Sequence, residues 1–192
     1  MKRPKRQRQR SLKSKTILLC VTGSIAAYRA CDLLRDLKSE GADVVCLMTE
    51  AAKRFVSPLT FHSLSGHPVY SDPFSEQEDW TVLHTTLADR ANLILIAPAT
   101  ADIIARLAAG FASDLVTSVV LASRAQVMIV PAMNDNMFHH AITQKNIEKL
   151  RNVGYKFVEP IKGDLVCGRV GVGHVAANDA ILNAVRKLIH AS

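Results

Sequence analysis

The sequence of 192 residues lacks the features that mark several common protein classes. It has no apolar run that approaches the ~20 residues needed to span a bilayer, and no apolar segment of the kind that follows the basic start of a secretory signal. Its four cysteines show neither CxxC spacing nor the histidine partners of a zinc site. These absences argue against membrane association, predict no metal site, and favour a chain that works in the reducing cytoplasm.

Acidic residues are missing from the first 15 positions, which hold 8 of the 24 Lys and Arg. The 16 basic residues that remain nearly balance the 17 Asp and Glu, so the net charge of +7 belongs to this segment. A block of like charges with few apolar residues cannot repay its ordering entropy. We therefore expect residues 1–15 to form a disordered basic tail and residues 16–192 to form one domain. The tail has no aromatic residues to stack on bases, which favours a solvated extension over nucleic-acid binding.

Short apolar runs alternate with amphipathic segments from residue 16 onward. The strand candidates are residues 16–22, 43–49, 92–100 and 125–133, with a weaker one at 155–160, and the helix candidates are residues 25–41, 101–110, 113–123, 143–154 and 178–192. Continuous apolar strands separated by helices predict a parallel sheet that is covered on both faces. The expected fold is a three-layer α/β/α, Rossmann-like, doubly wound domain. Residues 58–80 have poor periodicity and are expected to lie beside the sheet.

Small or hydroxylated residues follow each strong strand, in the stretches TGS, MTE, PAT and PAM. In an open parallel sheet, ligands bind outside the carboxyl ends of the strands, so these four turns should converge on one crevice. The first turn, Gly23 to Ile25, lacks the GxGxxG pattern of dinucleotide folds, whereas a mononucleotide with one phosphate would need less. Taken alone, the Gly-Ser pair is equally typical of a tight turn with a serine helix cap.

The stretch DLVCGRVGVGH, residues 164–174, places Cys167 among three glycines. It could be a phosphate cradle, a structural thiol in a tight loop, or a mobile flap that carries a reactive cysteine. Because it follows no strong strand and opens no clear helix, the phosphate cradle is the weakest of the three. Cys20, Cys31 and Cys46 fall instead in apolar patterns, where a thiol packs as a small hydrophobe.

Three separated motifs carry a resemblance to a known family. HTTLADRANLILIAPATAD, PAMNDNMF and CGRVGVGH have the order and spacing of the homo-oligomeric flavin-containing cysteine decarboxylases, and most closely resemble the phosphopantothenoylcysteine decarboxylases among them. The resemblance runs from about Thr16 to the C-terminus and implies FMN as cofactor. The flavin contacts that it implies are Gly23, Ser24, Ile25, Thr49, Thr100, Ala101, Asp102 and Ala132. The family commonly has Asn at the position of Asp102.

The resemblance also implies three active-site residues, His84, Asn134 and Cys167. Judged singly, His84 could flank a helix, Asn134 could be a helix N-cap, and Cys167 could be structural. In the implied roles, His84 is a base or hydrogen-bond partner at an oxidation step, and Asn134 holds the substrate carboxylate. Cys167 is the acid of a later reduction, on a flap that closes over the substrate and excludes water.

The implied reaction is the FMN-dependent decarboxylation of 4'-phosphopantothenoylcysteine to 4'-phosphopantetheine in coenzyme A biosynthesis, which is carboxy-lyase chemistry. Direct loss of carbon dioxide would leave a carbanion with no electron sink. If the flavin first oxidises the substrate thiol and its adjacent CH₂ to a thioaldehyde, decarboxylation gives an ene-thiolate instead. The reduced flavin then returns a hydride while an acid supplies a proton, so the whole reaction has no net redox change.

The flap departs from the usual family pattern at Val166, Arg169, His174 and Val175, where relatives commonly have an alanine, an acid and an Arg-Met pair. Arg169 could supply the positive charge that His174 lacks. Two other functions remain open: a flavin-dependent decarboxylase of a C-terminal peptide cysteine, and a non-catalytic flavin-binding regulatory relative.

The resemblance further implies a homotrimer or a dodecamer of trimers, with the flavin at a subunit boundary. In that case His84 and Asn134 of one site could come from different chains. The bifunctional bacterial members carry a synthetase domain behind the decarboxylase. We therefore expect either that a separate protein makes phosphopantothenoylcysteine or that this sequence is a fragment of a longer enzyme.

Overall fold

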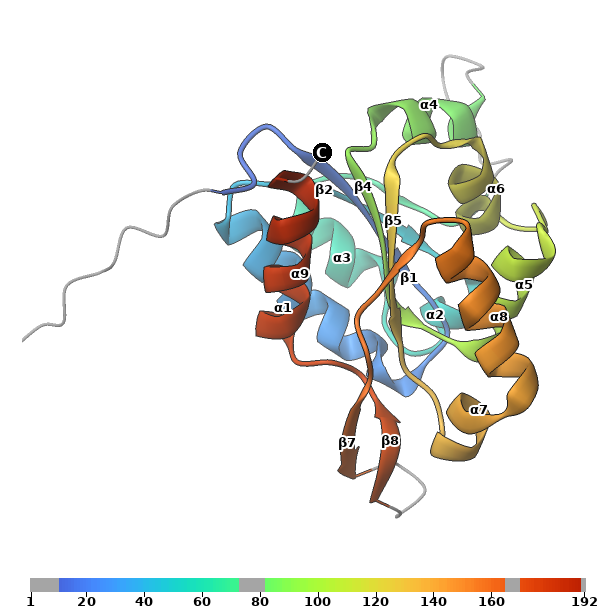
Figure 1. The fold of residues 1–192 in the computed structure, drawn as a ribbon. Coiled ribbons are helices and arrows are strands. Elements are labelled where there is room, and N and C mark those ends of the chain that lie inside the picture. Colours follow the sequence, from blue (N-terminus) through green and yellow to red (C-terminus); the bar gives the residue numbers. More distant parts are fainter. Residues whose placement is uncertain (1–10, 73–81, 165–169, 191–192) are drawn as a thin grey trace, which may run out of the picture.

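A six-stranded parallel sheet forms the centre of the computed structural model, which describes residues 11–72, 82–164 and 170–190. Its strands are β1 (Thr16–Val21), β2 (Asp43–Met48), β3 (Val69–Tyr70), β4 (Leu93–Ala99), β5 (Gln126–Pro131) and β6 (Lys156–Phe157). Their spatial order is β3-β2-β1-β4-β5-β6 (Figure 1). The order runs outward in both directions from β1 and β4, which confirms the predicted doubly wound sheet.

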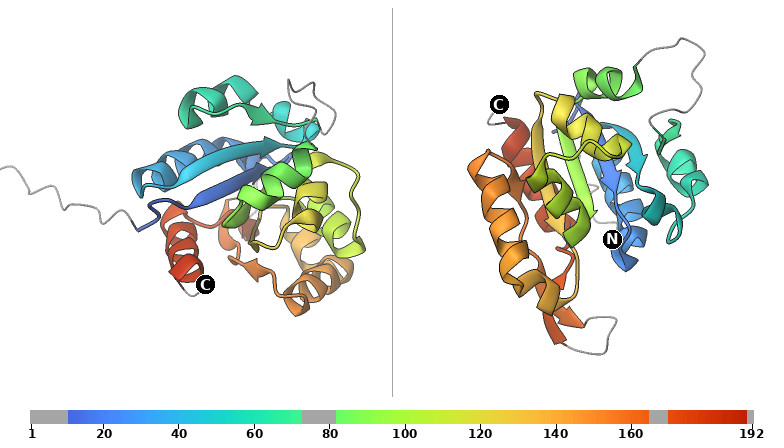
Figure 2. Two further views of the ribbon diagram at one scale, coloured as in Figure 1. Left: turned by 90° about the horizontal axis from the view of Figure 1, so that it is seen from above. Right: turned by 90° about the vertical axis from the view of Figure 1, so that its right-hand side faces the viewer.

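Helices cover both faces of the sheet (Figure 2). One face packs against α1 (Arg29–Ser39), α3 (Pro58–Ser65) and α9 (Asn178–His190), and the other against α4 (Leu83–Arg90), α5 (Ala101–Ala109), α6 (Leu115–Ala122) and α8 (Ala141–Asn152). Successive residues of β1 alternate between the two apolar clusters, with Leu19 on the first face and Leu18 on the second. Because both faces are buried, the strand reads as one continuous apolar run.

Only Val69–Tyr70 of residues 58–72 join the sheet, as β3, whereas α3 packs on one of its faces, so the expectation that the whole segment lies beside the sheet is wrong for β3. Phe61 of α3 is fully buried, and β3 extends the sheet edge by pairing with Cys46 and Leu47 of β2. A two-residue edge strand is too short to give a periodic signal in the sequence. The weak candidate at 155–160 is confirmed as β6 at the opposite edge.

The remaining elements gather where the strands end. They are η1 (Ile25–Tyr28), α2 (Glu50–Lys53), α7 (Asp135–His139), β7 (Ile161–Asp164) and β8 (Val170–His174). The last two pair antiparallel as a hairpin that projects from the lower end of the molecule beside α7 (Figure 1). Sequence analysis expected no strands here, because alternating glycines hide the period of two.

The N-terminal segment contacts the domain from Ser11, whereas the sequence placed residues 11–15 in a disordered tail. Leu12 is fully buried, and its N–H donates to the carbonyl oxygen of Glu40 at 3.1 Å. The Glu40 side chain, 4% exposed, accepts from Ser11 Oγ at 2.8 Å and from Arg186 of α9 at 2.7 Å. One buried carboxylate thus ties the start of the described chain to its last helix.

Replacing Glu40 with alanine should lower the free energy of unfolding by about 2–4 kcal/mol, because Arg186 and Ser11 lose a buried charged partner. Asp32→Ala is the control, since Asp32 pairs with Arg35 at the surface and should cost less than about 1 kcal/mol. Urea unfolding of both variants measures the difference. Equal losses would contradict a structural role for the buried carboxylate.

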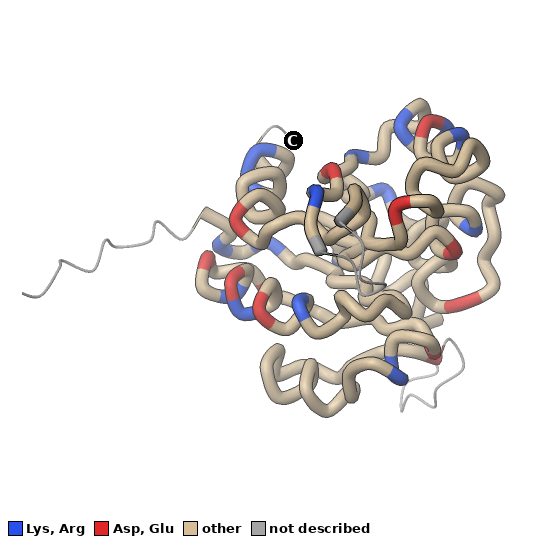
Figure 3. The backbone as a smooth tube through the Cα atoms, turned by 90° about the horizontal axis from the view of Figure 1, so that it is seen from below, with Lys and Arg blue, Asp and Glu red and all other residues tan. Residues whose placement is uncertain are grey.

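The body of the protein shows no segregation of charge. Seen from below, basic and acidic positions are interspersed over the described chain (Figure 3). None of its described helices is both long and apolar enough to cross a membrane. Its described residues also contain no group of three His, Cys, Asp or Glu side chains arranged to hold a metal ion.

Candidate active site

A cavity of about 660 Å³ lies at the carboxyl ends of the strands, where the order reverses between β1 and β4. Its lining includes seven of the residues that the resemblance implies as flavin contacts or active-site residues: Gly23, Ser24, Ile25, Thr100, Ala101, Ala132 and Asn134. The turns after β1, β4 and β5 therefore converge on one crevice, as the parallel sheet predicts. Thr49, Asp102 and His84 are not among the lining residues.

Hydroxyl and amide side chains at the strand ends cap the helices that follow. Ser24 accepts from the N–H of Ala26 at 3.2 Å, and Thr100 accepts from Ile103 at 3.3 Å. Asn134 Oδ1 accepts from the N–H of Asn136 at 2.9 Å, which makes it the N-cap of α7. Each of these residues both caps a helix and lines the cavity, so a role as helix cap does not exclude a role in the site.

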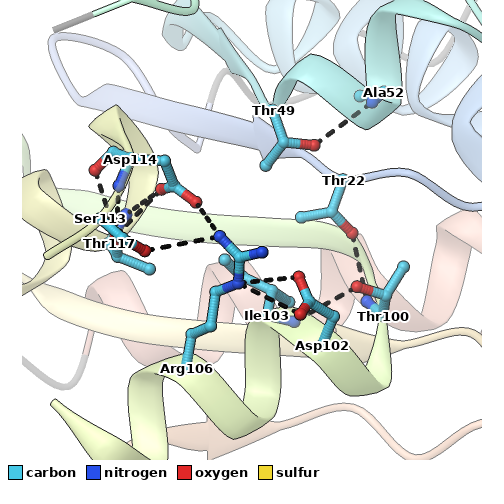
Figure 4. Close-up of polar contacts among 10 residues, drawn as sticks. All are labelled: Thr22, Thr49, Ala52, Thr100, Asp102, Ile103, Arg106, Ser113, Asp114 and Thr117. Carbon is cyan, nitrogen blue, oxygen red and sulfur yellow. Dashed lines mark hydrogen bonds and ion pairs between the residues drawn. The ribbon is translucent and has the colours of Figure 1, made fainter. Parts of the chain in front are cut away.

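Thr49 caps α2 in the same way, at 3.3 Å from the N–H of Ala52 (Figure 4). The start of α2 packs closely on the first turn: a Cβ on Gly23 would lie 2.4 Å from the Cβ of Ala51. Gly23 is therefore required by the packing of α2 as well as by any ligand. Thr49 supports the crevice from behind this turn.

Thr22 joins the ends of β1 and β4 at the base of the crevice. Its buried hydroxyl donates to the carbonyl oxygen of Pro98 at 2.7 Å and accepts from the N–H of Thr100 at 3.1 Å (Figure 4). This contact fixes the position of the Thr100 turn relative to the first turn. From the sequence, Thr22 is only part of the stretch TGS and has no predicted role, although a threonine at the end of an apolar strand could have indicated one.

The Asp102 side chain forms an ion pair with a residue of its own helix. Its carboxylate accepts from Arg106 Nε at 3.0 Å, and Arg106 also contacts Asp114, the N-cap of α6, at 3.3 Å (Figure 4). The Asp102 side chain is 68% exposed. In this position it stabilises the packing of α5 on α6 through Arg106, and the structure does not bring it to the cavity.

The β7–β8 hairpin packs on the turn that holds Asn134. The N–H of Met133 donates to the carbonyl oxygen of Gly173 at 3.0 Å. A Cβ on Gly173 would lie 2.1 Å from the carbonyl oxygen of Met133, and one on Gly171 would lie 2.8 Å from the Asp135 side chain. These two glycines permit close approach of two backbones. Cys167, with Val166 and Arg169, lies outside the described residues.

His84 lies at the other end of the molecule. It is the second residue of α4, which leads directly into the start of β4, whereas α7 and the hairpin lie where the strands end (Figures 1 and 2). The structure therefore brings Asn134 to the cavity of its own chain but not His84.

The three described cysteines are poor nucleophiles. Burial raises the pKa of the Cys46 thiol to about 12 and raises that of Cys20 further. Partial burial also raises the pKa of Cys31. Because the thiolate is the reactive form, this agrees with the structural role that the sequence assigned to them.

Fold and site together define a doubly wound α/β protein whose ligand crevice lies at the switch point of the sheet. Residues 5–190 match the family described as Flavoprotein. The chain belongs to this family, which confirms the resemblance drawn from its motifs.

Two curated relatives extend the comparison. The chain is 47% identical over 176 residues to the coenzyme A biosynthesis bifunctional protein CoaBC of Bacillus subtilis, covering 92% of this chain and 43% of that protein. It is 46% identical over 176 residues to a probable phosphopantothenoylcysteine decarboxylase of Streptococcus mutans, covering 91% of this chain and 98% of that protein. The chain thus spans less than half of the first relative and nearly all of the second.

Solved structures share the fold. A cysteine-to-serine mutant of PPC decarboxylase, complexed with pantothenoylaminoethenethiol, has a TM-score of 0.84 and 27% identity, covering 91% of this chain and 98% of that one. The FMN-dependent cysteine decarboxylase SpaF has a TM-score of 0.80 and 27% identity, covering 93% of this chain and 97% of that one.

Proposed function

We propose that the chain is a phosphopantothenoylcysteine decarboxylase that uses FMN, and that the strand-end crevice is its active site. The observation that carries the proposal is the meeting of three strand-end turns with Asn134 and the glycine hairpin around one cavity. The high identity to the Streptococcus mutans decarboxylase, over almost the whole of both chains, supports the substrate.

The residues around the cavity fit a flavin mononucleotide. Gly23, Ala101 and Ala132 leave room for a flat ring, and Ser24 and Thr100 offer hydroxyls. Helix α5 begins at Ala101, where the first N–H groups have no intrahelical partner and can meet a phosphate. Bound FMN would supply the oxidation and the later reduction of the substrate.

Asn134 is the residue of this chain best placed to orient the substrate. Its Oδ1 is held by the helix cap, so the amide group has a fixed direction at the cavity wall. An amide N–H can donate to the substrate carboxylate and hold it until carbon dioxide leaves. The hairpin that bonds to Met133 covers this position, and Cys167 follows β7 in the sequence as the proposed acid.

Flavin analysis and a substrate competition test this function. The purified protein should be yellow and should release FMN when denatured. Given equal amounts of phosphopantothenoylcysteine and a peptide with a C-terminal cysteine, it should release carbon dioxide from the first. Preference for the peptide would favour the peptide cysteine decarboxylase, and bound flavin without turnover of either would favour the regulatory relative.

The position of His84 supports an oligomer as the active form. Because α4 lies at the opposite end of the molecule from the crevice, His84 can serve only the crevice of another copy (Figure 1). Ile25, Tyr28 and Met137 line the cavity mouth and are 49–61% exposed, so a neighbouring chain would also bury apolar surface there. A closed trimer would repeat this arrangement at each boundary.

Oligomers that contain two different inactive chains test whether neighbouring subunits share each active site. His84→Asn and Asn134→Ala should each be nearly inactive alone. Co-expressed in equal amounts, they should recover about a quarter of the wild-type rate, since random mixing in a closed ring completes about that share of sites. Activity no greater than the sum of the two separate variants would place both residues in one chain's site.

A further inference from the structure

An arginine and a histidine that are far apart in the sequence meet at one end of the cavity. Arg29, the first residue of α1, brings its Nη1 to 3.5 Å from Nδ1 of His174 at the end of β8. The same Nη1 donates to the carbonyl oxygen of Val175 at 3.4 Å. Both side chains line the cavity that Asn134 also lines. This pair therefore belongs to the wall of the crevice.

Arg29 gives this end of the cavity a positive charge, and no carboxylate of the described lining residues balances it. The described lining residues include Arg29 but no Asp or Glu. Arg29 forms no ion pair with any described residue, and its Nε and Nη2 groups donate to none of them. A half-buried guanidinium whose Nε and Nη2 donate to no described residue can take an anionic partner.

His174 is held in a fixed orientation beside this charge. Its Nδ1 lies 3.0 Å from the carbonyl oxygen of Val175 and 3.5 Å from Arg29 Nη1, so the tautomer decides whether it donates to the first or accepts from the second. The side chain packs against Gly163 of β7, where a Cβ would lie 3.3 Å from its Cγ. Nε2 makes no hydrogen bond with the described part of the chain. With its proton on Nε2, His174 offers a donor to a ligand beside the guanidinium of Arg29, from a second element of the fold.

We propose that Arg29 and His174 form a phosphomonoester-binding site. Arg29 is the charged group of this cavity end, and His174 lies directly beside it. The inference rests on the proposed function, whose two ligands, FMN and phosphopantothenoylcysteine, both carry a phosphomonoester. The planar guanidinium fork matches two phosphate oxygens at once. Because Arg29 also bonds Val175, a bound phosphate would tie α1 to the hairpin.

Binding measurements with and without the phosphate test the proposal. Arg29→Met keeps the apolar stem and removes the charge, and Arg35→Met is the control on the exposed side of the same helix. The ligands are FMN and riboflavin with the apoprotein, and 4'-phosphopantetheine and pantetheine with the FMN-loaded protein. Arg29→Met should weaken one phosphorylated ligand about 10- to 100-fold and leave its unphosphorylated counterpart within about twofold.

The two pairs of ligands identify which phosphate is bound. If only the affinity for FMN falls, the site binds the flavin phosphate. If only the affinity for 4'-phosphopantetheine falls, it binds the substrate phosphate. His174→Ala should weaken the same ligand, and His174→Arg should restore it. Unchanged binding, or equal loss with and without phosphate, would overturn the proposal. A wild-type protein that binds these ligands but releases no carbon dioxide would contradict the proposed function alone.

Discussion

Replacement of Cys167 with serine should stop the reaction after carbon dioxide has left. The serine hydroxyl is a far weaker acid than the thiol, and loss of a general acid typically costs about 10²- to 10⁴-fold. We expect 4'-phosphopantetheine formation to fall by about 100-fold or more. Carbon dioxide release in a single turnover should continue, and the ene-thiol should accumulate. Mass spectrometry of the quenched mixture distinguishes the ene-thiol from the final product.

A matched variant separates this role from a general effect of losing a thiol. Cys31 is partly buried on α1 and does not line the cavity, so Cys31→Ser should leave both steps unchanged. Wild-type yields of 4'-phosphopantetheine from Cys167→Ser would remove the cysteine from the reductive step.

Replacement of Gly173 with alanine should have an effect of comparable size for a different reason. The new Cβ would lie 2.1 Å from the carbonyl oxygen of Met133, and the backbone φ of 152° is one that other residues rarely adopt. The hairpin must then move away from the turn that holds Asn134. Because a displacement of about 1 Å can cost about 10²-fold, kcat/KM should fall by about that factor.

Gly154→Ala controls for backbone strain alone. Gly154 also has a positive φ, at 102°, but a Cβ there meets nothing within 4 Å, and it lies at the end of α8. That variant should lose about 1 kcal/mol of stability while keeping its turnover. Steady-state kinetics and thermal unfolding of both variants supply the comparison. Full activity in Gly173→Ala would mean that the hairpin does not position the site.

The central sheet could be predicted from the sequence because its strands are buried on both faces. β1, β2, β4 and β5 begin and end within about two residues of the predicted runs, and β1, β4 and β5 bring small residues to the crevice, whereas the turn after β2 does not line it. The short edge strand β3 and the hairpin could not be predicted in this way. One has only two residues, and the glycines of the other reflect contact with Met133 and Asp135, which no local pattern records.

The same distinction separates the site residues that could be predicted from the sequence from those that could not. Residues next to strand ends, such as Ser24 and Asn134, could be predicted because the fold forces those ends together. Arg29 could not, since its contact with His174 depends on where the end of the hairpin meets the start of α1, which no local pattern records. Asp102 lies beside two lining residues in the sequence, but its carboxylate pairs with Arg106 along the helix, a contact that the sequence pattern did not indicate.

The most direct test of the account is product analysis after the FMN-loaded protein is mixed with phosphopantothenoylcysteine without oxygen. The account predicts one carbon dioxide and one 4'-phosphopantetheine per substrate, with the flavin oxidised at the end, because the oxidation and the reduction cancel. Recovery of unchanged substrate, or a product that leaves the flavin reduced, would contradict it.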